Sequence, residues 1–266
     1  MLKSFRQLDK ILRGDATQLP SLQQGKIEID TSGLSMVLLL LGMVYGLCAG
    51  SYAIIQSGGQ NYMQLIASMV KIPLLFFLTL AITFPSLYVF NTLIGSRLSI
   101  ISSMRLLIAS AGVMLAVLAS LGPIVVFFAL STTSYPFMIL LNVATSTVAG
   151  LLGLGFLLRT LHRLVIVQEG MEVQFSPPKQ DQAGDAGQKD ASQAKLSALD
   201  QVGKLTGRKA KSVFRIWTIV FALVGAQMSW VLRPFIGSPD MPFAWFREKE
   251  SNFFIAIFKA LVALFS

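Results

Sequence analysis

Few residues in this chain of 266 could carry out acid–base or metal chemistry. Such chemistry needs clustered histidine, cysteine or carboxylate side chains. The chain has one histidine, His162, and one cysteine, Cys48, and neither aspartate nor glutamate occurs between Thr31 and Gln168. We therefore expect a non-enzymatic protein without catalytic residues, a metal site or a cofactor.

Uncharged polar side chains inside apolar segments are the more informative candidates. Asn91, Asn142 and Gln227 each lie in a largely apolar run. In hydrocarbon, such amides need hydrogen-bond partners, which neighbouring helices supply. The three residues predict either interhelical hydrogen bonds that fix helix packing or a polar pathway for a neutral solute. A proton or ion pump is less favoured, because such proteins use ionisable residues near the membrane midplane.

Arg233 is a charged candidate in the sequence SWVLRPFIGSP, at the end of an apolar run. Its long side chain can reach lipid headgroups, and the following Pro234 breaks a helix. We expect Arg233 to end the last span near the outer interface as a helix-end anchor. The alternative is that Arg233 organises an outer cap by pairing with Asp240, Glu248 or a lipid phosphate, or by donating to a helix-end carbonyl.

The elements that must position these residues are membrane helices. The chain is 54% hydrophobic and only 13% charged, with a mean hydropathy of +0.66, which is outside the range of soluble proteins. A spanning helix needs roughly 20 mostly apolar residues. We predict an all-α membrane bundle in which residues 34–158 form four transmembrane helices and residues 216–236 form the fifth. The first four predicted helices cover residues 34–55, 72–94, 106–130 and 135–158.

The distribution of lysine and arginine predicts the orientation of these helices. Basic residues concentrate in residues 1–33, in the loop with Arg97 and Arg105, and in residues 159–215. Because basic segments favour the cytoplasmic side, we expect a multi-pass protein of the inner (plasma) membrane with a cytoplasmic amino terminus and an extracytoplasmic carboxyl terminus. The predicted outer loop 56–71 carries one basic residue, Lys71.

Residues 1–14 predict a basic amphipathic helix. Met1, Phe5, Leu8 and Leu12 share one helical face, and Gly14 is a natural helix stop. Such a helix is typical of a segment that lies on the cytoplasmic membrane surface, where it contacts anionic headgroups.

The loop 159–215 begins with an alternating stretch over residues 165–175 that predicts a small hairpin. Residues 176–194 are rich in small and polar residues and predict a disordered linker. Without a basic patch interleaved with aromatic residues, the composition does not favour a nucleic acid partner.

Two further features concern helix packing and the carboxyl-terminal tail. The sequence GLLGLG at residues 150–155 lies within a span and predicts a close helix-packing face. In the tail, residues 237–266, the apolar run 253–265 is too short to span, so we expect an interfacial or re-entrant helix. Ser251 or Asn252 could cap it.

The five spans, the cytoplasmic amino-terminal segment and the proline-containing segment KIPLLFFLTLAITFPSLYVFNTLIG resemble the Yip1-like membrane proteins. The likeness covers residues 34–236 and is strongest to bacterial relatives of unknown role. In eukaryotic members, the resemblance implies membrane organisation and recruitment of small GTPases by the amino-terminal region. It carries over no binding residues to this chain.

These observations favour a scaffold, an adaptor or a membrane-organising subunit of a complex, with the lipid bilayer and an unidentified membrane or cytoplasmic protein as partners. The alternative is a transporter or channel component for a neutral or small polar solute, which would pass between the second, fourth and fifth spans.

Overall fold

The computed structural model is helical throughout its regular structure. It describes residues 2–14, 31–59, 61–93, 100–174, 216–238, 243–246 and 252–265. The labelled helices in these ranges are α1 (Leu2–Arg13), α3 (Thr31–Gln56), α4 (Tyr62–Leu93), α5 (Ile100–Ser131), α6 (Tyr135–Gln174) and α8 (Phe253–Phe265). One more helix, Ile216–Val231, lies between α6 and α8 in the chain. The predicted all-α class is confirmed for these residues, and the predicted linker 176–194 lies outside them.

In the described part of the chain, four helices are long and apolar enough to cross a membrane. They are α3 over its whole length, Tyr62–Val89 of α4, Met104–Ser131 of α5 and Tyr135–Thr160 of α6. The Ile216–Val231 helix is apolar but shorter in the described part of the chain. It ends five residues before the predicted boundary at 236, because Pro234 cannot donate a backbone hydrogen bond and disfavours helical continuation.

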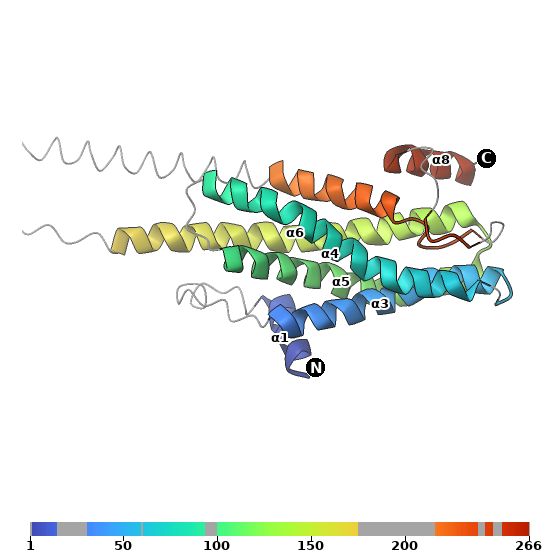
Figure 1. The fold of residues 1–266 in the computed structure, drawn as a ribbon, viewed down its shortest axis with the longest axis horizontal. Helices are drawn as coiled ribbons and strands as arrows, with labels where there is room; N and C mark the ends of the chain where they lie inside the picture. The colour runs from blue at the N-terminus through green and yellow to red at the C-terminus, as the bar shows by residue number, and fades with distance from the viewer. Residues whose placement is uncertain are drawn as a thin grey trace, which may run out of the picture.

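Two turns bring the long helices back on themselves at one end of the bundle (Figure 1). The first turn, at residues 57–61, joins α3 to α4, and the second, at residues 132–134, joins α5 to α6. We refer to this as the turn end. In the first turn, Gly58 and Gly59 have φ values of +62° and +93°, a backbone conformation that favours glycine.

Helix α4 begins ten residues before the predicted second span. The predicted loop 56–71 is wrong from Tyr62 onward, because residues 62–71 are helical. Gln64, Ser68 and Lys71 made this stretch polar enough to resemble a loop. In the folded chain all three are buried on the helix.

Helix α6 continues through Gln174, so the hairpin predicted for residues 165–175 is wrong over its described part. A short alternating stretch is weak evidence for strands when it directly follows a long helix in the chain. Once a helix has formed, each added residue gains one backbone hydrogen bond and needs no new nucleus.

Helix α3 is central and packs against α1, α4 and α5. Its glycines 42, 46 and 50 recur every four residues and face α4. A Cβ atom at Gly46 would lie 2.6 Å from the Ser68 carbonyl oxygen and 2.7 Å from the Met69 Cα. Small residues at this spacing let two membrane helices approach closely.

The Ile216–Val231 helix is held against α4. The Trp217 side chain is fully buried, and its indole nitrogen donates to the Ser86 hydroxyl at 3.1 Å. The Trp217 ring also packs against Phe221, with ring centroids 5.4 Å apart. These contacts fix the inward face of this helix opposite α4.

Helix α1 contacts α3 and α5 through Leu8, which belongs to the predicted apolar face, and Ile11, which does not. Leu8 and Ile11 are 5% and 1% exposed, whereas Phe5 and Leu12 are 42% and 49% exposed. Leu8 packs over Gly112 of α5. Leu8 and Ile11 are three residues apart and fit between α3 and α5. Helical periodicity alone does not show which pair of apolar residues on α1 faces the bundle. Gly14 ends the helix with φ +82°, as predicted.

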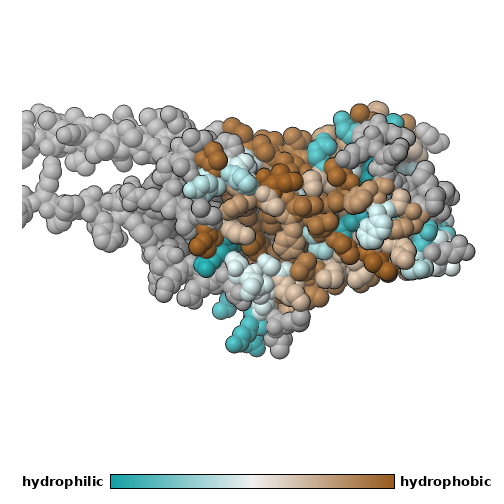
Figure 2. All heavy atoms as spheres, viewed as in Figure 1, coloured by the Kyte–Doolittle hydropathy of each residue, from teal (hydrophilic) through white to brown (hydrophobic). Residues whose placement is uncertain are grey.

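Apolar residues cover much of the surface of the long helices, as Figure 2 shows. Ile82, Phe127, Leu130 and Leu151 are each more than half exposed. An apolar exterior of this extent suits contact with lipid chains, since soluble monomers rarely expose large apolar patches.

We predict that Gly46→Ala destabilises the bundle by about 1–3 kcal/mol, because the added methyl group would force α3 and α4 apart. Gly155→Ala is the matched control, since a Cβ atom there meets no atom within 4 Å. Unfolding in detergent micelles measures both variants. Equal stability of Gly46→Ala and the wild type would contradict the close α3–α4 packing.

Candidate functional site

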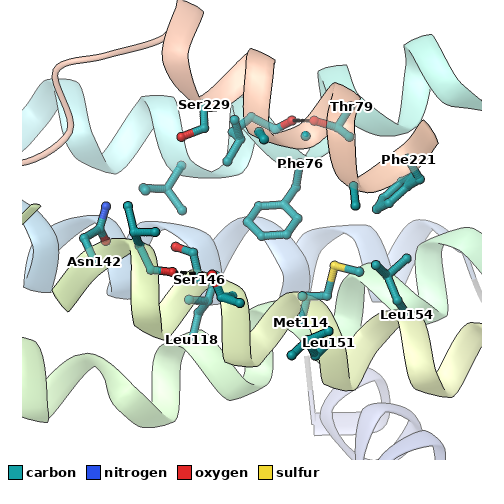
Figure 3. Close-up of a pocket in the computed structure, with 18 of the residues that line it drawn as sticks. Phe76, Thr79, Met114, Leu118, Asn142, Ser146, Leu151, Leu154, Phe221 and Ser229 are labelled. Carbon is teal, nitrogen blue, oxygen red and sulfur yellow. Dashed lines mark hydrogen bonds between the residues drawn. The ribbon is translucent and has the colours of Figure 1, made fainter. Parts of the chain in front are cut away.

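A cavity of about 290 Å³ lies where α3, α4, α5, α6 and the Ile216–Val231 helix meet (Figure 3). Phe253, the first residue of α8, also lines it. Most of the lining side chains are apolar, and the described lining residues include no charged side chain. A charged ligand would therefore find no counter-charge on these walls, so the cavity suits an uncharged molecule.

A hydrogen-bonded cluster crosses from α3 to α6 at one side of the cavity. The Tyr45 hydroxyl donates to the Asn142 Oδ1 atom at 2.7 Å and lies 2.9 Å from the Thr145 hydroxyl. The Thr145 hydroxyl also lies 3.0 Å from the Asn142 carbonyl oxygen, to which it can donate. This cluster fixes the Asn142 amide, so its nitrogen atom has a defined direction.

Most polar groups of the cavity lie toward the turn end, whereas Thr79, whose hydroxyl donates to the Leu75 carbonyl oxygen, lies near Phe221 at the other end. Asn142 and Ser146 lie in the first half of the spanning part of α6, and Ser229 lies close to the end of its helix. Met114, Leu154 and Phe221 line the opposite end, as Figure 3 shows. Asn142 and Leu154 are twelve residues apart, which corresponds to about 18 Å along the helix. The cavity thus has one polar end and one apolar end.

The structure brings only one of the three predicted pathway residues to this cavity. Asn142 lines it, whereas Gln227 is half-buried and is not one of the lining residues, although Ala226 and Ser229 are. Asn91 lies in α4 twelve residues beyond Thr79, the last lining residue of that helix, or about 18 Å farther along. The side chain of Asn91 lies outside the described part. A pathway through all three residues stays a prediction.

The glycines of the GLLGLG sequence differ in their surroundings. A Cβ atom at Gly153 would lie 2.2 Å from the Met114 Cγ atom and 3.0 Å from the Ser110 carbonyl oxygen, so Gly153 packs closely on α5, as predicted. A Cβ atom at Gly150 or Gly155 would meet nothing within 4 Å, and only Gly150 lines the cavity.

A second polar site lies at the turn end, where α4 holds the chain segment that follows the Ile216–Val231 helix. Lys71 is 1% exposed. Its ammonium group donates to the carbonyl oxygen of Pro234 at 3.2 Å and to that of Trp245. The ammonium also lies 5.3 Å from the centroid of the Phe246 ring, a distance at which a cation–π interaction is favourable.

Gln64 and Ser68 extend this contact along the same face of α4. The Gln64 amide nitrogen donates to the Pro234 carbonyl oxygen at 3.0 Å, and the Ser68 hydroxyl donates to the Phe235 carbonyl oxygen. With Lys71, these residues follow the helical spacing i, i+4, i+7. We call this set of contacts the Lys71 latch. In the sequence, this spacing would have indicated a polar helix face if residues 62–71 had been predicted as a helix.

Arg233 immediately precedes the segment that the latch holds. Its guanidinium carbon lies 3.7 Å from the centroid of the Trp230 ring, one helical turn earlier. The predicted partners Asp240 and Glu248 lie outside the described residues. The role of Arg233 as an organiser of the outer cap therefore stays a prediction. The carbonyl oxygens of the two residues that follow Arg233 accept hydrogen bonds from side chains of α4.

Helix α8 follows the latched segment and packs against α6. The Asn252 side chain accepts a hydrogen bond from the Ile255 backbone nitrogen at 3.0 Å, which confirms Asn252 as the helix cap. In Figure 1, α8 lies beside the bundle near the turn end. The cap places Phe253 at the start of α8, where it lines the cavity.

A search of the described residues for three or more clustered histidine, cysteine or carboxylate side chains finds no such group. The site therefore offers hydrogen bonds and apolar contact, and its described walls offer no ligand set for a metal.

We predict that Lys71→Ala loosens the segment from Pro234 to Phe246, because it leaves the Pro234 and Trp245 carbonyl oxygens without the ammonium donor. Losing such buried partners costs about 1–3 kcal/mol. Chymotrypsin should then cleave after Trp245 or Phe246 several times faster than in the wild type. Lys259→Ala, on the exposed side of α8, is the control and should match the wild type. An unchanged cleavage rate for Lys71→Ala would argue against the latch.

Comparison with protein-family models, with curated proteins and with solved structures finds no match to this chain. The resemblance to the Yip1-like membrane proteins consequently stays a prediction from the layout of the sequence. The functional conclusion for this chain must come from its own residues.

Proposed function

We propose that this chain is a non-enzymatic, multi-pass membrane protein that binds a small uncharged molecule within the bilayer, as the binding component of a transporter or channel. The observation that carries this proposal is the cavity between α4, α6 and the Ile216–Val231 helix, with its apolar walls and few polar groups. Ligand sites in proteins typically combine such walls with a small number of fixed hydrogen-bonding groups.

The scaffold or adaptor role with an unidentified protein partner, which the sequence favours, is our second proposal. The segment over residues 159–215 would supply a contact surface for a cytoplasmic partner, and the structure describes only its part up to Gln174. The cavity provides a specific physical argument for ligand binding, and so we place binding first.

The proposed topology has the Ile216–Val231 helix as part of a fifth span in the inner membrane. The amino terminus is cytoplasmic, the turn end is extracytoplasmic, and anionic headgroups contact the basic cytoplasmic segments. The charge pattern supports this orientation: the described turns 57–59, 61 and 132–134 carry no basic residue, whereas Arg105 and Arg159 lie toward the opposite end.

We expect a reporter fused before Met1 to be active only in the cytoplasm and one fused after Ser266 to be active only outside it. The physical reason is that an odd number of spans places the two termini on opposite sides. Cytoplasmic activity of the Ser266 fusion would contradict the five-span topology.

We predict that Gly150→Leu prevents ligand binding, because the new side chain would enter the cavity while its Cβ atom meets no neighbour. The measurement is mass spectrometry of solvent extracts from the full chain purified from native membranes. An uncharged molecule should be enriched with the wild type over protein-free membrane discs and should fall at least severalfold in Gly150→Leu.

Gly155→Leu is the matched control, since its Cβ atom also meets open space but the residue does not line the cavity. It should retain the molecule at the wild-type level. Equal content in Gly150→Leu and wild type, or no enriched molecule in the wild type, would overturn ligand binding in the cavity.

A further inference from the structure

The direction of the Asn142 amide carries information about the ligand. Its oxygen atom accepts the hydrogen bond from the Tyr45 hydroxyl, so the amide nitrogen turns away from α3. In Figure 3, this nitrogen points across the cavity toward the helix that carries Ser229. Among the described residues, this nitrogen donates no hydrogen bond. An amide with two N–H donors facing an apolar space favours a ligand that brings an acceptor oxygen.

Three hydroxyl groups of the cavity wall already use their hydrogen atoms, whereas the rotatable hydroxyls of Ser146 and Ser229 also line the cavity and can donate or accept. The Thr79 hydroxyl donates to the Leu75 carbonyl oxygen at 2.7 Å, and the Thr147 hydroxyl donates to the Val143 carbonyl oxygen at 2.7 Å. The Tyr45 hydroxyl donates to Asn142. The Asn142 amide nitrogen is therefore the best-defined donor that the described wall offers to a ligand.

The apolar end of the cavity indicates the chemical nature of the other part of the ligand. Phe76, Met114 and Leu154 extend the walls away from Asn142 and toward the interior of the bundle. A molecule with several polar groups would leave some of them without partners there, at a free-energy cost for each. A hydrocarbon chain suits these walls, because burying it is favourable.

We propose that the cavity binds a neutral amphiphile whose single hydroxyl or carbonyl oxygen accepts a hydrogen bond from the Asn142 amide nitrogen and whose hydrocarbon part lies between Phe76 and Leu154. This inference rests on the proposed binding function and specifies its ligand class. The ligand lies with its oxygen toward the turn end and its hydrocarbon part toward the bilayer interior, the orientation of a membrane alcohol or ketone in one leaflet.

Three photoreactive probes of the same chain length test the inference: a primary alcohol, the matching alkane and the matching carboxylic acid, each with a diazirine in the chain. The full chain is reconstituted in lipid discs, and mass spectrometry measures the fraction of protein labelled at Phe76, Leu154 or Phe221. In the wild type, the alcohol should label these residues roughly three- to tenfold more than the alkane, the ratio expected for one hydrogen bond. The carboxylic acid should label them no more than the alkane.

Asn142→Leu should reduce the alcohol to the level of the alkane. Thr160→Val is the structural control, because Thr160 is a buried polar residue of the same helix, α6, that neither belongs to the hydrogen-bonded cluster nor lines the cavity. It should keep the ratio of alcohol to alkane labelling. A general loss of packing would lower the labelling by both the alcohol and the alkane and leave their ratio unchanged. A change in the ratio therefore reports recognition of the oxygen atom.

The outcomes separate this inference from the binding function. If the alcohol and the alkane label the wild type equally and Gly150→Leu blocks both, the cavity binds apolar molecules but the role of Asn142 is wrong. Stronger labelling by the carboxylic acid than by the alcohol would overturn the neutral ligand class. If Gly150→Leu leaves the labelling by all probes unchanged, both the inference and the binding site fail.

Discussion

The structure at the turn end depends on the burial of the Lys71 ammonium group. A charge in an apolar helix bundle is stable only when protein groups replace its water. Here backbone carbonyl oxygens of Pro234 and Trp245 and the ring of Phe246 surround it. These groups belong to a chain segment that lies more than 160 residues later than Lys71. The contacts that stabilise the Lys71 ammonium group therefore hold this later segment against α4 at the turn end.

The latch in turn requires the close approach of α3 and α4. Gly46 leaves no room for a side chain at the level of Ser68, and Gly42 lies against Pro73, two residues after Lys71. With α4 held in this position, its polar face of Gln64, Ser68 and Lys71 meets the segment after the Ile216–Val231 helix. Backbone carbonyl oxygens that end a helix within an apolar bundle need such donors.

The cavity follows from these two constraints. The α3–α4 contact places Tyr45 where its hydroxyl reaches Asn142 of α6, and the burial of Trp217 holds Phe221 opposite Phe76. The small residues Gly150 and Gly225 then leave space between the helices that no described side chain fills. Space of this size between helices, next to a fixed polar group, is a reason to expect a ligand.

The sequence by itself determined the helical class, the four long apolar helices, the stop at Gly14 and the cap at Asn252, because composition, run length and capping are local properties. It identified Asn142 as a polar residue that needs a partner. It could not show that Tyr45 is that partner, because the two residues lie 97 positions apart and only the packing of both α3 and α6 on α5 brings them together. Likewise, Lys71 looked like a loop residue until tertiary contacts supplied the carbonyl oxygens that make its burial in a helix stable. Which polar groups meet was decided by the tertiary structure, since hydrogen bonds act over about 3 Å in space whatever the separation along the chain.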